Sequence, residues 1–375
     1  RVCTTAEADT LQSVTDRGFT TTNSLSVASL TATGKIIGGN NNTANGNFAA
    51  VLGGKNNTAG GNYTNVAGGS ANNITDAENC WATIGGGGNN KIDLSSGAVI
   101  GGGTGNKIDA SGNYNVIAGG RNNTAAGYTD MTIGGGRNNR TLYFEATVAG
   151  GRDNKAYGCA SNVAGGCCNT ASGVKSNIAG GSFNLANGAN AAVLGGFINQ
   201  AIGTCSNVAG GEVNTACGNN SNVAGGSNNC ANGNNSNVAG GFSNCSIGIF
   251  SNVAGGRSNQ AIGNCSAILG GTTNIVCAAH INSFIIGSNL TSSAACTTFV
   301  NNLSSQGTVY GAELYDNGNR VCTTAEADTL QSVTDRGFTT TCSIQVASLT
   351  ATGKIIGGNN NTANGAGAAV LGGDA

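Results

Sequence analysis

The sequence predicts an all-β fold, a parallel β-solenoid whose coils are each about 15 residues long. Three observations support this prediction: a short phrase recurs at a fixed spacing, the composition suits thin stacked layers, and proline is absent. The chain has 375 residues, of which 65 are Gly, and only 9% are charged. This composition disfavours an aromatic globular core, and abundant Gly without a Gly-X-Y period excludes collagen.

The short period is clearest after position 160, where each coil reads S-N-V-A-G-G-x-x-N-x-A-x-G-x-x. Upstream coils are less regular, because the interval between successive Gly-Gly steps varies there. Together with a degraded last copy at Ile286-Gly287, the steps predict 17 coils over residues 34–287. The steps begin at positions 38, 53, 68, 85, 101, 119, 134, 150, 165, 180, 195, 210, 225, 240, 255 and 270.

Each coil is expected to contain short strands rather than helices. Fifteen residues are too few for a pair of helices, and Gly and Asn are poor helix formers. Segments such as SNVAG and NTA suit strands, joined by turns in which Gly and Asn accept positive φ. Coils stacked about 4.8 Å apart would form a rod of roughly 80 Å. Without proline, every interior N–H can pair with the next coil.

One Asn follows each Gly pair at the same register, so these side chains are expected to stack along the rod. Stacked amides can form a ladder of side-chain hydrogen bonds. The predicted structural ladder consists of Asn169, Asn184, Asn199, Asn214, Asn229, Asn244, Asn259 and Asn274.

A second, longer period is also present. Residues 1–54 return at 320–373 with five differences. This duplication predicts a tandem array with a unit of about 319 residues, of which the chain is expected to be a window.

Four segments are expected on this basis. Residues 1–33 form the end of a connector, 34–287 the solenoid, 288–352 a cap and connector, and 353–375 the start of the next solenoid. Within the connector, Thr308–Val321 alternates and turns at an Asp-Asn-Gly step, which predicts a β-hairpin. Residues 325–337 are expected to form a short helix closed by Gly337.

The regular coil resembles the head repeats of trimeric autotransporter adhesins, which carry an S-V-A-I-G phrase followed by an A-x-G turn. The resemblance covers residues 34–287 and implies a left-handed parallel β-roll in which three chains pack side by side. The coil is one residue longer than is usual in that family, and it has Gly where the family often has Ile. The connector phrases LYDNGNRV and DTLQSVTDRGFTTT resemble segments of bacteriophage tail fibres, which are also trimeric.

A trimer is also expected on physical grounds. A coil with one Val and a few Ala buries little apolar area against the entropy of ordering the whole coil. Packing three rolls together would bury a second row of small apolar side chains. That row consists of Ala164, Ala179, Leu194, Ala209, Ala224, Ala239, Ala254 and Leu269.

The chain has 14 Cys, and several of them share a coil register, which predicts disulfides in an oxidising, extracellular setting. Neighbouring coils bring equal registers within about 5 Å, a separation that suits a disulfide. The candidate pairs are Cys230–Cys245, which share one register in adjacent coils, and Cys205–Cys217 and Cys265–Cys277, whose members are each twelve residues apart, a little under one coil. Unpaired thiols that replace Ala or Ser are the alternative.

No catalytic, metal or cofactor site is predicted. The chain has a single His, His280, near the expected end of the solenoid, and no paired CxxC motif. The segment 102–108 approaches a calcium-binding repeat, but Lys107 stands where the carboxylate ligand is required. A net charge of −1 does not indicate the positive surface that binds nucleic acid. No apolar run is long enough to span a membrane.

The sequence therefore predicts a non-enzymatic structural shaft of an extracellular, cell-surface or virion-surface fibre, self-associating as a homotrimer of end-to-end units. The alternative is an adhesin that contacts a host-surface glycan or protein through the irregular coils 70–150, which carry Trp81, Tyr143 and Phe144. Ice binding is a weaker alternative, because the residue after each ladder Asn is not regularly Thr.

Overall fold

The computed structural model describes residues 34–75 and 80–301, together with four strands at 314–316, 319–321, 355–357 and 369–371. The chain divides into two compact units, Arg1–Leu303 and Ser304–Ala375. Every regular element in the described residues is a strand. The helix predicted over 325–337 and the connector at 1–33 lie outside them.

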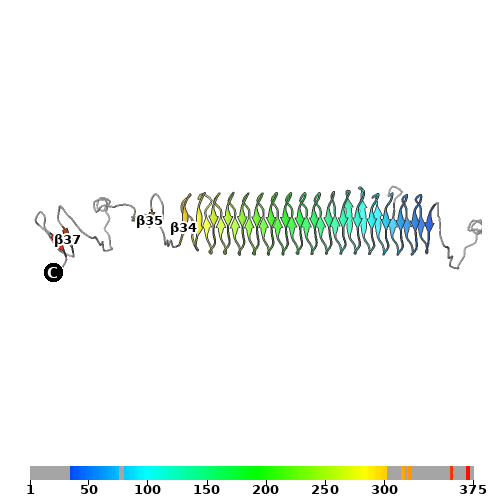
Figure 1. Ribbon diagram of the computed structural model, residues 1–375, viewed down its shortest axis with the longest axis horizontal. Coiled ribbons are helices and arrows are strands. Elements are labelled where there is room, and N and C mark those ends of the chain that lie inside the picture. Colours follow the sequence, from blue (N-terminus) through cyan, green and yellow to red (C-terminus); the bar gives the residue numbers. More distant parts are fainter. Residues whose placement is uncertain are drawn as a thin grey trace, which may run out of the picture. The chain divides into compact units, whose positions relative to one another are not determined.

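The first unit contains a parallel β-solenoid of about 17 turns with about 15 residues per turn, which confirms the predicted fold class. Figure 1 shows the coils stacked one behind another along the solenoid, each perpendicular to its long axis. Two continuous parallel sheets run the length of the stack, and most coils contribute one strand to each sheet.

The first sheet has 18 strands, all parallel to their neighbours. They are β1 (Ile36–Ile37), β3 (Ala50–Val51), β5 (Asn65–Val66), β7 (Thr83–Ile84), β9 (Val99–Ile100), β11 (Val116–Ile117), β13 (Thr132–Ile133), β15 (Thr147–Val148), β17 (Asn162–Val163), β19 (Asn177–Ile178), β21 (Ala192–Val193), β23 (Asn207–Val208), β25 (Asn222–Val223), β27 (Asn237–Val238), β29 (Asn252–Val253), β31 (Ala267–Ile268), β33 (Phe284–Ile286) and β34 (Thr298–Val300).

The second sheet has 16 strands. They are β2 (Thr43–Ala44), β4 (Thr58–Ala59), β6 (Asn73–Ile74), β8 (Lys91–Asp93), β10 (Lys107–Ala110), β12 (Thr124–Gly127), β14 (Arg140–Thr141), β16 (Lys155–Ala156), β18 (Thr170–Ala171), β20 (Leu185–Ala186), β22 (Gln200–Ala201), β24 (Thr215–Ala216), β26 (Cys230–Ala231), β28 (Cys245–Ser246), β30 (Gln260–Ala261) and β32 (Ile275–Val276).

A third ladder runs between the two sheets and consists of single-residue parallel bridges, one per coil. The bridging residue comes directly after the Gly pair, and we call this set the bridge column. Its members are Asn40, Lys55, Ser70, Gly88, Thr104, Arg121, Arg137, Arg152, Cys167, Ser182, Phe197, Glu212, Ser227, Phe242, Arg257 and Thr272.

The core is a set of columns, because each coil pairs in register with the next. In the coil that begins at Ser161, the buried side chains are Ser161, Val163, Asn169 and Ala171. Alternate residues of a strand point to opposite faces, so the phrases SNV and NTA each turn their first and third residues inward. Val163 therefore stacks on Ile178, and Ala171 stacks on Ala186. The core is narrow, as the small side chains predict.

Each regular coil turns at three residues in the left-handed region of backbone space. In the coil that begins at Ser161 they are Gly166 (φ 85°), Cys168 (φ 60°) and Lys175 (φ 56°). A Cβ on Gly166 would lie 2.1 Å from the carbonyl oxygen of Gly181, so the position requires Gly. Gly173 has no positive φ, but a Cβ there would lie 2.0 Å from the oxygen of Gly188. Both glycines therefore permit close coil-to-coil stacking.

The register differs from the sequence prediction in three of the irregular coils. The left-handed Gly equivalent to Gly69 is Gly87, Gly103 or Gly136, so the Gly pairs there begin at 86, 102 and 135 rather than at 85, 101 and 134. Runs of three or four Gly leave the alignment ambiguous in the sequence, and only the stacking resolves it. The solenoid also continues past position 287, because β34 pairs in parallel with β33.

The second unit contains two strand pairs. β35 (Leu314–Asp316) and β36 (Asn319–Val321) are antiparallel and place Asp316 opposite Asn319, which confirms the predicted hairpin. β37 (Ile355–Gly357) and β38 (Ala369–Leu371) are parallel, with Ile355 opposite Ala369. The duplicated residues at the start of the first solenoid, Ile36 and Ala50, pair in the same way.

Candidate functional site

The eight Asn of the predicted ladder form a buried column, but their amides do not bond to one another. Asn199 donates through Nδ2 to the carbonyl oxygens of Gly195 (2.8 Å) and Gly211 (2.9 Å), and its Oδ1 accepts the backbone N–H of Asn214 (2.9 Å). The same three kinds of bond recur at every one of the eight. Each side chain thus fastens its own Gly pair to the next coil.

Amide-to-amide bonds occur at a different register, in the SNV strands. Asn222 donates to Asn237 (2.7 Å) and accepts from Asn207 (2.8 Å), and Asn162 donates to Asn177 (2.8 Å). These side chains are half-buried on the outer face of the first sheet, where the backbone groups already pair within the sheet. The buried Asn column instead faces carbonyls of the Gly turns, which explains the difference.

Of the candidate disulfide cysteines, Cys230 and Cys245 lie directly opposite each other on neighbouring strands. The Cys230 thiol donates to the Cys245 sulfur, so the pKa of Cys230 is raised and that of Cys245 is lowered. Burial, followed by the nearby Cys230, raises the pKa of Cys217. The structure therefore groups Cys217 with Cys230 and Cys245.

The remaining candidates lie at turns. Cys205 and Cys265 are exposed and occupy left-handed corners, at φ 56° and 54°. The Cys277 thiol donates to the carbonyl oxygen of Ser292 at 3.7 Å. The Ser292 hydroxyl is also 2.7 Å from Nδ1 of His280, so His280 belongs to the packing of the last coils.

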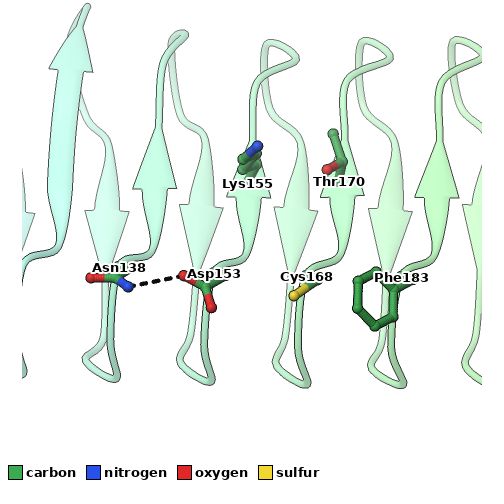
Figure 2. Close-up of a pocket in the computed structure, with 6 residues that line it drawn as sticks. All are labelled: Asn138, Asp153, Lys155, Cys168, Thr170 and Phe183. Carbon is green, nitrogen blue, oxygen red and sulfur yellow. Dashed lines mark hydrogen bonds between the residues drawn. The ribbon is translucent and has the colours of Figure 1, made fainter.

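A cluster that the sequence prediction missed lies at one corner of the solenoid, where the irregular coils pass into the regular ones. Asn138, Asp153, Cys168 and Phe183 occupy the same corner position in four successive coils, and Figure 2 shows them in a row. Together with Lys155 and Thr170 they line a pocket of about 370 Å³. Asn138 donates to Oδ1 of Asp153 at 3.0 Å and orients that carboxylate.

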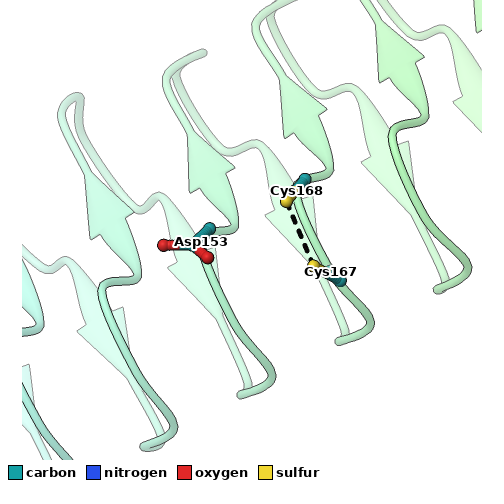
Figure 3. Close-up of side chains that lie close together, drawn as sticks. All are labelled: Asp153, Cys167 and Cys168. Atoms are coloured by element: carbon teal, nitrogen blue, oxygen red, sulfur yellow. Dashed lines mark hydrogen bonds between the residues drawn. The ribbon is translucent and has the colours of Figure 1, made fainter.

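Cys167 and Cys168 are adjacent in sequence, and their Sγ atoms are 3.1 Å apart (Figure 3). One coil earlier, Arg152 stacks on Cys167 and Asp153 stacks on Cys168, so a charged pair faces a pair of thiols. Nη2 of Arg152 is 3.1 Å from the Cys167 sulfur, and its Nε is 3.4 Å from Oδ2 of Asp153.

The electrostatics of this cluster favour one thiolate. Hydrogen bonds from the Cys168 thiol and then from the Arg152 guanidinium lower the pKa of Cys167. Donating that bond, together with burial, raises the pKa of Cys168. The spacing could have revealed the cluster, because Arg152-Asp153 precedes Cys167-Cys168 by one coil.

Aromatic side chains form a second feature, at the other left-handed corner of the irregular coils. Phe48, Tyr63 and Trp81 are stacked with nearly parallel rings, at 5.1 Å and 6.0 Å between centroids. The Tyr114 ring continues the row by lying over Gly97, where a Cβ would be 2.8 Å from it. Each ring in this aromatic row is more than half exposed.

A second aromatic group lies further along the solenoid. Tyr128 packs on Tyr143 at 5.2 Å and on Phe144 at 4.4 Å between centroids. Trp81, Tyr143 and Phe144, singled out from the sequence, therefore belong to two separate exposed groups.

Positive charge gathers in the coils that carry the second aromatic group. Arg121, Arg137 and Arg152 are consecutive members of the bridge column. Arg152 pairs with Asp153, whereas within residues 34–75 and 80–301 neither Arg121 nor Arg137 has an ion-pair partner. Like charges directly opposite on neighbouring strands are destabilising. Arg121 and Arg137 lie directly opposite each other, so two positive charges without an ion-pair partner among the described residues are held side by side.

The chain matches no protein-family model and no curated protein. Among the described residues, no helix combines the length and the apolar character needed to cross a membrane. The function is therefore inferred from the chain's own residues.

Proposed function

We propose that the chain is a structural shaft of an extracellular or virion-surface fibre, built from tandem units of about 319 residues. The observation that supports this most is the unbroken parallel ladder from β1 to β34, in which each coil bonds to the next along two sheets and the bridge column. Such a stack gives a fixed rise of about 4.8 Å per coil. Its role is mechanical reach, not catalysis.

The duplication supports tandem assembly. Residues 320–373 repeat residues 1–54, and the copy forms the same parallel strand pair that opens the first solenoid. In a fibre of such units, solenoids and connectors alternate along one chain.

We further propose that three chains pack side by side through the predicted row of small apolar residues. Leu194 and Leu269 are about half exposed in the single chain, and Ala164 and Ala179 are also exposed. The row continues through Leu52 near the start of the solenoid, which is 55% exposed. A long exposed apolar row on a monomer favours burial against a partner.

The neighbouring glycines support close approach of a second copy. A Cβ on Gly165, Gly180 or Gly195 would meet no atom within 4 Å, so there is room for a side chain at each position. The absence of side chains there leaves a flat strip beside the apolar row, where another backbone can approach. In the trimer, this strip would lie at the interface.

Electron microscopy of the native material tests the shaft. Long filaments are expected, with an axial repeat of at least the roughly 80 Å of the solenoid. Isolated compact particles would refute the proposal.

Light scattering tests the trimer. Leu194→Lys places a charge in the apolar row and is expected to convert trimers to monomers. Gln260→Lys, at an exposed position on the second sheet, is the matched control and should remain trimeric. A wild-type chain that is monomeric at micromolar concentration would contradict the trimer, whether or not filaments form.

A second candidate function is adhesion to an acidic glycan, which the Arg row favours. Arg121 is exposed and Arg137 is half-buried, and neither is neutralised by a carboxylate among the described residues. Guanidinium groups form paired hydrogen bonds with sulfate, phosphate or carboxylate groups. A linear acidic polysaccharide lying along the rod would meet one Arg per coil over the three coils that carry Arg121, Arg137 and Arg152.

Heparin, as a model sulfated polysaccharide, tests this function against neutral dextran. Arg121→Ser/Arg137→Ser is expected to weaken heparin binding at least tenfold and to flatten its salt dependence. Arg257→Ser is the matched control, because Arg257 occupies the same column but packs alone over Phe242 at 5.5 Å. Equal binding by the two variants would contradict adhesion through the Arg row.

A further inference from the structure

We propose that Asp153, Cys167 and Cys168 form a binding site for a thiophilic divalent cation such as Zn²⁺. One carboxylate oxygen and the two sulfurs all lie within 4.8 Å of one another. This group is the one set of three potential ligands so close together in the described residues. The proposal is independent of the shaft and adhesion functions.

The distances fit a tetrahedral ion after a small adjustment. Zinc–sulfur bonds of about 2.3 Å in tetrahedral geometry place two sulfurs roughly 3.8 Å apart. The two Sγ atoms are 3.1 Å apart, so they must separate by less than about 1 Å. All three side chains are only partly buried, and rotation about their χ angles can supply this movement.

The backbone holds the three ligands in place. The Cys168 N–H donates to the Arg152 oxygen at 2.9 Å, and the Cys167 N–H donates to the Gly181 oxygen at 3.0 Å. Asp153 and Cys168 occupy equivalent left-handed corners, at φ 57° and 60°. The stack therefore fixes the positions of the ligands before any ion arrives.

The surrounding charges balance a bound dication. Two thiolates and one carboxylate carry three negative charges, and a dication leaves one. Arg152 contacts both Cys167 and Asp153 and supplies the remaining positive charge. Asn138 holds the carboxylate by its Oδ1, as groups outside the ligand set commonly do around metals.

The donor set determines which cations fit. Thiolates select zinc and other soft ions, whereas magnesium and calcium require oxygen ligands. With three protein ligands, a fourth position is left for water or an added ligand, and the pocket lined by Lys155, Thr170 and Phe183 opens beside Cys168.

Zinc titration of the full, reduced chain under anaerobic conditions tests the site, with bound zinc counted by calorimetry and by elemental analysis. Wild type is expected to bind one more equivalent than Cys167→Ser/Cys168→Ser. Asp153→Asn keeps both thiols and should lower the affinity for that equivalent at least tenfold. Cys159→Ser, which lies between the ligands in sequence but outside the set, is the control and should retain it.

Cadmium gives a spectroscopic readout on the same variants. The thiolate-to-cadmium ultraviolet band should lose the contribution of two sulfurs in the double variant and keep it in Cys159→Ser. Circular dichroism checks that each variant remains folded. Equal zinc stoichiometry in wild type and the double variant would overturn the proposal, as would a Cys167–Cys168 disulfide in protein isolated with zinc present.

Discussion

Left-handed corners impose a conformational cost on every coil, and the residues that occupy them vary widely. Val213 and Ile198 are at φ 55°, where a β-branched side chain is strained, whereas Asn228 in the next coil tolerates this region. The corner residue contributes little to the core, since Val213 is 39% exposed. Local strain at these positions is therefore a consequence of the coil's shape.

Val213→Asn should relieve this strain and stabilise the solenoid by about 1 kcal/mol. Chemical denaturation followed by circular dichroism measures the change. Asn228→Val is the inverse control at the same corner and should destabilise, partly because Asn228 also donates to Ser243 at 2.9 Å. An unchanged or lower stability of Val213→Asn would contradict the strain.

Asp93 is a residue whose charge state should contribute to stability. Burial alone would raise its pKa, but hydrogen bonds from Lys91 (2.6 Å) and Thr75 outweigh burial and lower it. A lowered pKa means that the folded state favours the carboxylate. This contribution is complete above the unfolded pKa of about 3.9 and is lost as pH falls through the lower folded value.

Asp93→Asn should therefore reduce stability by a constant amount above about pH 4, and the difference from wild type should shrink below that pH. Urea denaturation between pH 2 and pH 7 measures it. In a Lys91→Met background the effect of Asp93→Asn should be smaller. If the stability difference between wild type and Asp93→Asn grew as the pH fell, the stabilising role of the Asp93 carboxylate would be contradicted.

At the scale of the element, the buried Asn column contributes more to the stability of the solenoid than a stack of amides bonded only to one another would. Asn199 donates to two carbonyls of the Gly turns and accepts one N–H of the next coil. Removing the Asn199 side chain leaves the Asn214 N–H and the Gly195 carbonyl oxygen without their hydrogen-bond partner. A buried backbone group that lacks a partner costs about 1–3 kcal/mol of stability.

Asn199→Ala should destabilise the solenoid by about 2–5 kcal/mol. Asn207→Ala, which removes one half-buried amide pair, is the matched control and should cost about 1 kcal/mol. Hydrogen exchange should show the loss of protection centred on the N–H of Asn214. Similar effects of the two variants would mean that the buried column has no special role.

The disulfide prediction belongs to the strand pair β26 and β28. Cys230 and Cys245 are in register, and in-register residues on parallel strands lie about 4.8 Å apart, which suits a disulfide. Peptide mapping of unreduced protein is expected to find this bond. Reduction should then lower stability by up to about 3 kcal/mol, as for a loop of this length.

Cys230→Ser/Cys245→Ser should be insensitive to reductant and is the control. Alkylation of both residues without prior reduction would contradict the bond. The Cys205–Cys217 and Cys265–Cys277 pairs stay predictions, although Cys217 lies beside Cys230 and Cys277 donates to Ser292.

Much of this fold was predictable, because the short period determines which residues stack. The positions of Val163, Asn169 and Ala171 in the core follow from that period alone. What the Asn side chains bond to was not predictable, since it depends on which Gly carbonyls face inward. The cluster of Cys167 and Asp153 was missed because its residues are not neighbours in sequence, although the period does place them together.

At the scale of the whole molecule, the number of coils should set the length of the rod. Deleting residues 206–265 removes four whole coils and joins Cys205 to Ser266, which keeps every column in register. The shortened rod should fold and be about 19 Å shorter, measured by small-angle scattering. Deleting 206–258 breaks the register by half a coil and is the control, which should fold poorly.

The irregular coils show that the length of the rod depends on the number of coils and not on the number of residues in each coil. Ile108 pairs with Ala125 in the second sheet just as Ala156 pairs with Ala171, although the first two are further apart in sequence. The extra residues widen the perimeter without adding to the axial advance. The length of the rod and the shape of its surface can therefore vary independently. Insertions at the turns can change which side chains the rod displays, while the distance between its two ends stays constant.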